Sequence, residues 1–242
     1  MEDARQRDVR GDADISSVAA LLAEPSRAAM LTALLDGRAL AAGELAKVGG
    51  VGAATASAHL ARLLDGGLVV VVRQGRHRYY RLAGAEVAEV MEVLARVSPR
   101  PAVRSLRQSR QAWLLGEART CYDHLAGRAG VELLGALVEG GHLEAVDDGY
   151  PGGIMPDAFV VSARGEVRLK ELGVDLDAAR RGRRRFAPAC LDWTERRPHL
   201  GGALGAAVMA ALVEAGWFTR GPARRVIRVT EEGRAGLEEI RR

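Results

Sequence analysis

The feature that most constrains the fold of this chain is an internal repeat in its C-terminal half. Residues 124–143 align without a gap with residues 199–218, and the match resumes after a loop, where 159–165 aligns with 227–233. A repeat of this kind predicts two copies of one supersecondary unit that pack on each other and share a core. Each copy is expected to consist of a helix, a glycine-led turn, a loop, a strand and a final helix.

The final helix of each copy has a candidate N-cap. Ser162 and Thr230 directly precede these helices, and a side-chain oxygen in that position accepts a hydrogen bond from a free amide of the first turn. The order of elements is also similar to the second half of a winged helix. The copies, residues 121–178 and 186–242, are therefore predicted to be two tandem winged-helix-like modules, with a helical connector at 99–120.

The N-terminal third is expected to be helical because its apolar residues recur at spacings of three and four. Asp14 is a candidate N-cap for the first of these helices. The predicted helices cover residues 15–23, 27–35, 42–48 and 52–64. The last two are short and are joined by a turn at Gly49 and Gly50, which favours a helix-turn-helix.

Two extended segments follow the helix-turn-helix. Leu68–Val72 is a run of apolar, mostly β-branched residues, His77–Leu82 is a second extended stretch, and Gln74-Gly75 can turn the chain between them, which predicts a β-hairpin. Residues 73–81 hold four arginines and no acid, and so equal the net charge of +4 of the whole chain. A last helix is predicted at Ala85–Val97, with an apolar stripe typical of a dimer seam or a core face.

These patterns predict a mainly α-helical chain with small β-hairpins, an α+β class, in which residues 1–98 form a winged helix-turn-helix DNA-binding domain. No apolar run is long enough for a membrane span, and the charged N-terminus lacks the apolar core of a signal peptide. We therefore expect a cytoplasmic protein with no membrane partner. Two cysteines are too few for a disulfide framework.

The N-terminal region resembles the ArsR-type winged-helix repressors. The resemblance lies in Leu22-Ala-Glu-Pro-Ser-Arg27, Glu44-Leu-Ala46, Thr55-Ala-Ser-Ala-His-Leu60, Gly67-Leu-Val69 and Gly75-Arg-His-Arg-Tyr-Tyr-Arg-Leu82. It implies a homodimeric transcriptional repressor that places one recognition helix of each subunit in the major groove of double-stranded DNA.

The residues expected to contact DNA are short polar groups of the second helix of the motif and the charged and aromatic groups of the hairpin. They are Thr55, Ser57, His59, Arg62, Arg73, Arg76, His77, Arg78 and Tyr79. The helix has few side chains able to read bases, because Gly52, Ala53 and Ala54 stand where such repressors often carry longer polar residues. Affinity is therefore expected to depend on the wing and its contacts with phosphates.

Members of the ArsR family often sense metals through cysteines of the third helix or through His, Asp and Glu pairs of the last one, and neither set is present. Each repeat instead begins with Cys-x-Asp and carries a histidine. The candidate effector-binding residues are Cys121, Asp123, His124, Cys190, Asp192, Trp193 and His199. Four of them have the ligand chemistry of zinc and related ions, which makes Cys121, His124, Cys190 and His199 candidate ligands of a divalent metal ion.

Three interpretations of the cysteine and histidine residues remain open: metal binding, a structural role in which the thiol packs at the start of a helix, and small-molecule or redox sensing. The cysteine-to-histidine spacing is three in one copy and nine in the other, so equivalent geometry is not guaranteed. The sequence has no catalytic set, and so predicts a regulator, not an enzyme. The rival interpretations are a cofactor-binding enzyme or a partner-docking protein that carries a regulatory winged-helix domain.

Overall fold

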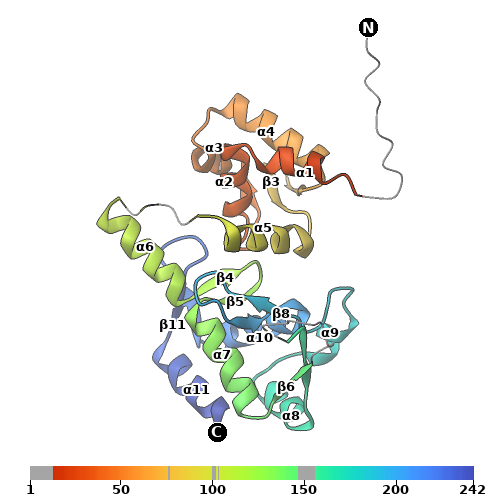
Figure 1. The fold of residues 1–242 in the computed structure, drawn as a ribbon, viewed down its shortest axis with the longest axis vertical. Coiled ribbons are helices and arrows are strands. Elements are labelled where there is room, and N and C mark those ends of the chain that lie inside the picture. The colour runs from red at the N-terminus through yellow and green to blue at the C-terminus, as the bar shows by residue number, and fades with distance from the viewer. Residues whose placement is uncertain (1–12, 76, 100–101, 103, 147–155) are drawn as a thin grey trace. The chain divides into compact units, whose positions relative to one another are not determined.

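The computed structural model describes residues 13–75, 77–99, 102, 104–146 and 156–242 (Figure 1). The chain divides into two compact units, residues 1–32 with 39–83, and residues 33–38 with 84–242. Both are built from helices and short antiparallel hairpins, which confirms the predicted α+β class. None of the helices in the described ranges is long and apolar enough to cross a membrane.

The described part of the first unit contains four helices and one small sheet. The helices are α1 (Ile15–Leu22), α2 (Pro25–Ala33), α3 (Ala42–Gly49) and α4 (Ala53–Asp65). Asp14 caps α1 as predicted, since its carboxylate accepts a hydrogen bond from the amide of Ser16 at 3.1 Å. Helix α2 starts two residues earlier than predicted, at Pro25, because the fixed φ angle and missing N–H of proline suit the first position of a helix.

The sheet of the first unit has the strand order β1-β3-β2, with β1 (Leu40–Ala41), β2 (Val69–Gln74) and β3 (His77–Leu82) all antiparallel. Gly75 has a φ of 58°, the left-handed conformation that such a tight turn requires. The hairpin of β2 and β3 is the predicted wing. Strand β3 has the predicted bounds, and β2 runs to Gln74, beyond the predicted end at Val72.

The second unit begins with two helices, α5 (Ala85–Val97) and α6 (Leu106–Glu117). Helix α5 has the predicted bounds. It belongs to the same compact unit as the repeats, so the division of the chain falls directly after the wing. The predicted boundary at residue 98 lies one helix further on.

The two repeats have the same order of elements: a hairpin, a long helix, a second pair of strands and a final helix. The first copy contains β4 (Arg119–Cys121), β5 (His124–Ala126), α7 (Arg128–Glu139), β6 (Leu143–Val146), β7 (Ala158–Val161) and α8 (Ala163–Glu171), followed by α9 (Leu176–Arg181). The second contains β8 (Ala189–Leu191), β9 (Pro198–Leu200), α10 (Gly202–Glu214), β10 (Phe218–Arg220), β11 (Ile227–Val229) and α11 (Glu231–Arg241). The hairpin at the start of each copy was not predicted, and the winged-helix-like character of the copies stays a prediction.

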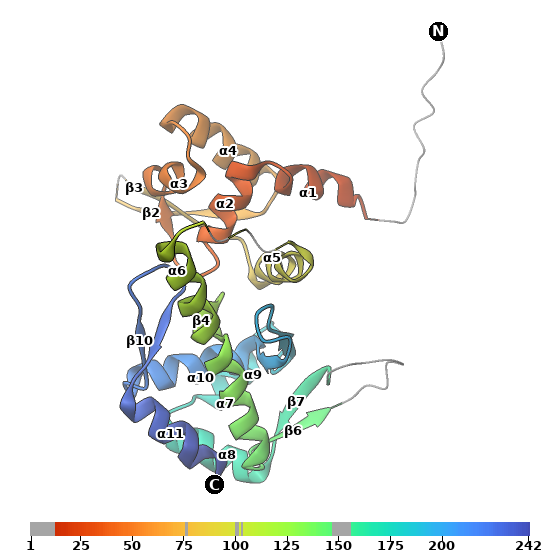
Figure 2. The ribbon, with the colours of Figure 1, turned by 60° about the vertical axis from the view of Figure 1, so that its left-hand side comes forward.

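The predicted caps of the final helices are present. The hydroxyl of Ser162 accepts a hydrogen bond from the amide of Gly165 at 2.9 Å, and that of Thr230 accepts one from the amide of Gly233 at 3.0 Å. Figure 2 shows the last helix, α11, beside α7 of the other copy, in agreement with their contacts. The chain therefore returns at its C-terminal end to the first repeat.

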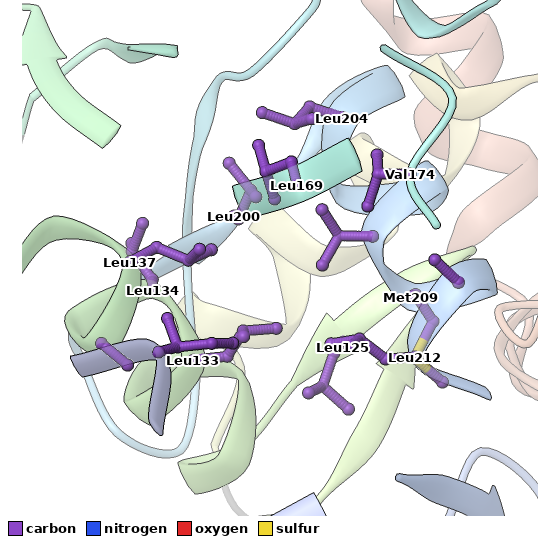
Figure 3. Packing of buried hydrophobic residues seen from close by; sticks show 14 of the residues in the cluster. Leu125, Leu133, Leu134, Leu137, Leu169, Val174, Leu200, Leu204, Met209 and Leu212 are labelled. Atoms are coloured by element: carbon purple, nitrogen blue, oxygen red, sulfur yellow. The ribbon is translucent and has the colours of Figure 1, made fainter. Parts of the chain in front are cut away.

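The two repeats share one apolar core (Figure 3). Leucines of α7, such as Leu133 and Leu137, lie in it together with Leu204 and Leu212 of α10 and Leu169 of α8, and all are nearly inaccessible to solvent. Burying a leucine side chain contributes about 1.5–3 kcal/mol. A core built jointly means that neither copy buries its apolar face alone.

Glycines allow the two copies to interlock. A Cβ atom on Gly130 of α7 would meet the carbonyl oxygen of Leu125 at 2.6 Å and the side chain of His199 at 3.5 Å, and one on Gly205 of α10 would meet Leu200 at 2.4 Å and His124 at 3.1 Å. Each long helix thus packs on its own hairpin and on the histidine of the other copy. This arrangement brings the two hairpins together.

Candidate DNA interface and Cys–His cluster

Helix α4 holds the candidate DNA-reading side chains on an exposed face. Its buried residues, Ala56, Leu60 and Leu63, fix it in the first unit, while Thr55 and Arg62 are exposed. Ser57 is also exposed, and its hydroxyl donates to the carbonyl oxygen of Ala53 at 2.9 Å within the same helix. The face offers one long cationic side chain and few groups that read bases.

His59 has a different orientation from its neighbours on α4. Its side chain is only 13% exposed, with Nε2 3.7 Å from a carboxylate oxygen of Glu24 and Nδ1 3.5 Å from the guanidinium of Arg27. Arg27 also donates to the carbonyl oxygens of Ala20 and Leu21. This geometry favours a role in fastening α4 to α2 over a DNA contact for His59, a role that the sequence pattern did not reveal.

The wing presents arginines directly opposite each other. In the β2–β3 register Arg73 pairs with Arg78, and Gln74 pairs with His77. Like charges on directly opposed residues are destabilising unless an anion lies close. Both arginines are exposed, and neither forms an ion pair with any acid in the part of the chain that the structure describes. The wing therefore has cationic groups available for phosphates, while Arg76 lies outside the described residues.

The remaining wing residues lie beside these arginines. The rings of His77 and Tyr79 are 6.4 Å apart between centroids, and His77 is exposed whereas Tyr79 is half-buried. Tyr79 faces Val72 on the neighbouring strand. The exposed end of the wing thus combines cationic, imidazole and aromatic groups, a composition suited to the backbone of a nucleic acid.

A second candidate site lies in the repeats, where the hairpins place each cysteine opposite a histidine. Cys121 is the register partner of His124 in β4–β5, and Cys190 is the register partner of His199 in β8–β9. The six extra residues of the second copy are one further strand pair, Leu191 with Pro198, and four additional loop residues. Strand pairing therefore makes the two copies equivalent although their spacings in the sequence differ.

These four residues converge on one point. Their candidate ligand atoms all lie within 4.8 Å of one another. The two sulfur atoms are 3.9 Å apart, and the two imidazole rings stack with centroids 5.2 Å apart. Cys121, His124 and His199 are buried, and Cys190 is half-buried. The interpretation of the cysteines as thiols at helix starts is wrong, because both residues lie in strands.

The histidine nitrogens that face the cluster lack partners. Nε2 of His124 and both ring nitrogens of His199 are buried and form no hydrogen bond with any described group. Buried polar atoms are normally satisfied, so an orphan of this kind needs an explanation such as an ion. Each imidazole also has a carboxylate near Nδ1, with Asp123 3.4 Å from His124 and Asp192 3.7 Å from His199.

Asp192 is the best-supported carboxylate of the cluster. Its fully buried side chain accepts hydrogen bonds from Arg119 at 2.9 Å and from the amide of Gly127 at 2.7 Å, and from the hydroxyl of Thr194 at 2.6 Å. Burial raises the pKa of this carboxyl, but the charge of Arg119 and these hydrogen bonds outweigh it, so that its pKa lies well below the ordinary value. Asp192 therefore stays ionised and joins the two hairpins.

Two further predicted residues surround the cluster. The guanidinium of Arg119 lies 4.6 Å from the ring centroid of Trp193, a cation–π contact. Trp193 therefore packs on the arginine that binds Asp192 and is not one of the four candidate ligands. Asp123 forms an ion pair with Arg184, one residue of an arginine-rich stretch at 180–185. Arg119 is buried, and its partner Asp192 lies 73 residues later in the chain. The sequence pattern did not identify it.

The two thiols differ in acidity. Their mutual hydrogen bond, reinforced by burial, raises the pKa of Cys121 well above its ordinary value. The same hydrogen bond lowers the pKa of Cys190 against the effect of burial, with help from His124 and His199. Burial also opposes charge on His124, but its hydrogen bond with Asp123 and the nearby sulfur of Cys190 raise its pKa to about 9. The arrangement favours a thiolate on Cys190 beside an imidazolium.

A pocket of about 330 Å³ within the second unit reaches this cluster. Cys121, His124 and Cys190 lie at its surface, together with residues of α5 such as Glu89 and Val93. His199 does not line it. The cluster is therefore approached from the side of Cys190, the more exposed of the two cysteines.

Helix α5 is attached to the repeats by a second buried ion pair. Glu92, on α5, pairs with Arg225, and their side chains are only 7% and 11% exposed. Arg225 also donates from Nε to the carbonyl oxygen of Thr120 at 3.1 Å, next to Cys121. Arg225 thus links α5, the helix that follows the wing, to β4, the strand that carries Cys121.

The fold and the exposed wing define a winged-helix DNA-binding protein. A helix-turn-helix domain family matches residues 22–72. The uncharacterized HTH-type transcriptional regulator YdfF of Bacillus subtilis is 42% identical over 226 residues, which cover 93% of this chain and 96% of that protein. The chain belongs to the HTH-type transcriptional regulators, and it is a DNA-binding transcriptional regulator.

Solved structures similar to the N-terminal part include two mycobacterial proteins. The homodimeric winged helix-turn-helix domain of Mb0332 from Mycobacterium bovis is 34% identical and covers 35% of this chain and 84% of that one, with a TM-score of 0.31. The cadmium sensor CmtR from Mycobacterium tuberculosis is 33% identical and covers 38% and 99%, with a TM-score of 0.30.

Proposed function

We propose that this regulator is a homodimeric, cytoplasmic repressor that binds operator DNA through α4 and the wing and is released when a divalent metal ion binds Cys121, His124, Cys190 and His199. The observation that carries the proposal is the convergence of two thiols and two imidazoles, all within 4.8 Å, from two hairpins that belong to different repeats.

The donor set fits a thiophilic ion that prefers tetrahedral coordination. Two thiolates bound at the zinc–sulfur distance of about 2.3 Å in a tetrahedron lie about 3.8 Å apart, and the two sulfur atoms of the cluster are 3.9 Å apart. The carboxylates near each Nδ1 support Nε2 as the ligand atom, because ligating histidines usually place an acceptor at their other nitrogen. Zinc, cadmium and cobalt share this ligand chemistry.

The DNA-binding role rests on the wing and on α4. Arg73 and Arg78 supply cationic groups without an acidic partner among the described residues. Affinity that depends on contacts between such groups and phosphates falls as the salt concentration rises. Thr55, Ser57 and Arg62 are the exposed groups of α4 that can reach the major groove. Phosphate contacts and DNA shape are therefore proposed to supply much of the affinity for double-stranded DNA.

The homodimer is proposed from α5. Four apolar residues at helical spacing on this helix, Val90, Val93, Leu94 and Val97, are between 39% and 78% exposed. An exposed apolar stripe at this spacing suits a helix-on-helix contact with a second copy. Sedimentation of the purified protein should give the mass of a dimer, and Val93→Glu together with Val97→Glu should shift it to a monomer.

The test of metal sensing uses the full chain in reducing buffer. Cobalt titration should produce the absorption of tetrahedral cobalt with thiolate ligands at one equivalent per chain, and zinc should displace it. Cys190→Ser should abolish the thiolate band, whereas Glu171→Gln, an exposed carboxylate far from the cluster in sequence, should leave it unchanged. An octahedral spectrum, or none, would reject the site.

The link to DNA is tested on genomic fragments that the protein enriches in a pull-down. Zinc should lower affinity for such a fragment in a fluorescence titration of the wild type and leave the Cys190→Ser variant unaffected. Equal affinity with and without zinc in the wild type would reject release by metal, and a rise in affinity would make the protein a metal-activated binder.

A further inference from the structure

We infer that Cys121 and Cys190 are also an oxidation site, at which a hydroperoxide forms a disulfide in the metal-free protein and thereby removes both sulfur ligands. The competition between oxidant and metal rests on the proposed metal site, whereas formation of the disulfide does not. The pair would give the regulator a second input at the same place.

The geometry of the two sulfur atoms carries this inference. They are 3.9 Å apart, on β4 and β8, which belong to two different hairpins. A disulfide requires about 2.05 Å between sulfurs, so each has to move by roughly 1 Å. Their separation in sequence did not indicate this proximity.

Access to the two thiols is unequal. Cys190 is half-buried, whereas Cys121 is 3% exposed. Both line the pocket of about 330 Å³, which is large enough to admit a small hydroperoxide. Oxidation is therefore expected to begin at Cys190, with Cys121 as the resolving thiol behind it.

The chemistry balances with the hydroperoxide as oxidant. Cys190 Sγ attacks one oxygen of ROOH, the O–O bond breaks, and Cys190–SH plus ROOH gives Cys190–SOH plus ROH. Cys121 Sγ then attacks the sulfenic sulfur, the S–O bond breaks, and water leaves with the thiol proton. Two thiols are oxidised to one disulfide, and one hydroperoxide is reduced.

Metal and disulfide exclude each other at this site. A disulfide consumes both thiolates and leaves only His124 and His199, which cannot hold a tetrahedral ion by themselves. A bound metal in turn occupies the sulfur lone pairs that attack the oxidant. Zinc should therefore protect the pair, and oxidation of a loaded protein should release zinc.

The experiment compares metal-free and zinc-loaded full-length protein, treated with hydrogen peroxide after removal of the reductant. In the metal-free protein, mass spectrometry should show an intramolecular loss of about 2 Da and a Cys121–Cys190 cross-linked peptide. Zinc should slow this reaction about tenfold or more, with zinc release following disulfide formation. Cys121→Ser should instead accumulate a trappable sulfenic acid, and Cys190→Ser should react slowly.

Each outcome decides one part of the inference. Sulfinic acid or intermolecular disulfides as the main products of the wild type would overturn it. A disulfide that forms equally fast with and without zinc would overturn the competition alone. If cobalt fails to bind the reduced protein while the disulfide still forms, the metal proposal falls and the oxidation site stands.

Discussion

Arginines in the two units of this protein have opposite surroundings. In the wing, Arg73 and Arg78 face each other across two strands and have no acidic partner among the described residues. In the second unit, Arg119, Arg184 and Arg225 are paired with Asp192, Asp123 and Glu92.

The difference teaches how a weakly basic chain can still have a defined DNA-binding surface. Paired arginines are neutralised within their own unit, and three arginines of the stretch at 180–185 belong to this class, since Arg180 pairs with Glu166, Arg184 with Asp123 and Arg185 with Asp157. Cationic groups without a carboxylate partner remain available to phosphates. The net charge of +4 therefore equals the charge of the wing segment 73–81 alone.

The largest effect is expected from Asp192→Asn. The substitution leaves the buried guanidinium of Arg119 without its counter-charge, and breaking a buried pair in this way costs about 3–5 kcal/mol. Urea unfolding should show the loss. Asp157→Asn, at an exposed pair with Arg185, is the matched control and should change stability by less than about 0.5 kcal/mol. Equal effects of the two would mean that the buried pair is not structural.

The double substitution Arg73→Ala and Arg78→Ala tests the arginines that have no carboxylate partner among the described residues. Loss of two phosphate contacts should reduce the slope of log affinity against log salt by about two and weaken DNA binding at every sequence. The control is Arg168→Ala with Arg180→Ala, two arginines paired with glutamates. An unchanged slope in the wing variant would remove the distinction between the two classes.

A smaller effect is expected from Glu92→Gln on α5. The neutral amide should weaken the buried pair with Arg225 and, since one hydrogen bond can remain, lower the free energy of unfolding by about 2 kcal/mol. Glu89→Gln removes the same charge from an exposed position of the same helix and should be nearly neutral. If metal binding persists in Glu92→Gln but no longer changes DNA affinity, the pair also couples the cluster to α5.

The smallest effect is expected from His59→Ala. Its contacts with Glu24 and Arg27 predict a loss of about 0.5–1 kcal/mol in stability with an unchanged salt slope. Thr32→Ala, whose exposed hydroxyl bonds only within α2, serves as control. A lower slope without loss of stability would restore His59 to the DNA-contacting residues.

Local patterns predicted the parts of the fold that depend on local physics. The bounds of β3 and α5 and the caps at Ser162 and Thr230 followed from apolar periodicity and short-range hydrogen bonding. The membership of the HTH-type transcriptional regulators followed from motifs within the first unit. These features depend on residues a few positions apart.

The hairpins of the cluster were missed for a physical reason. Each strand has three residues, too few to show an alternating pattern. The partnership of Arg119 with Asp192 joins residues 73 positions apart, and only packing of the two repeats brings them together. The four candidate ligands were identified by residue type, but the geometry that unites them depends on strand register.

That register has a consequence for how relatives of this site should be sought. When a ligand pair is set by two residues facing each other across a hairpin, as Cys121 faces His124 and Cys190 faces His199, the connecting loop can lengthen without moving either donor. A search for a fixed number of residues between cysteine and histidine would overlook such proteins. The loop itself is left free to diverge, so descendants of one duplication can acquire different surfaces around an unchanged set of donors.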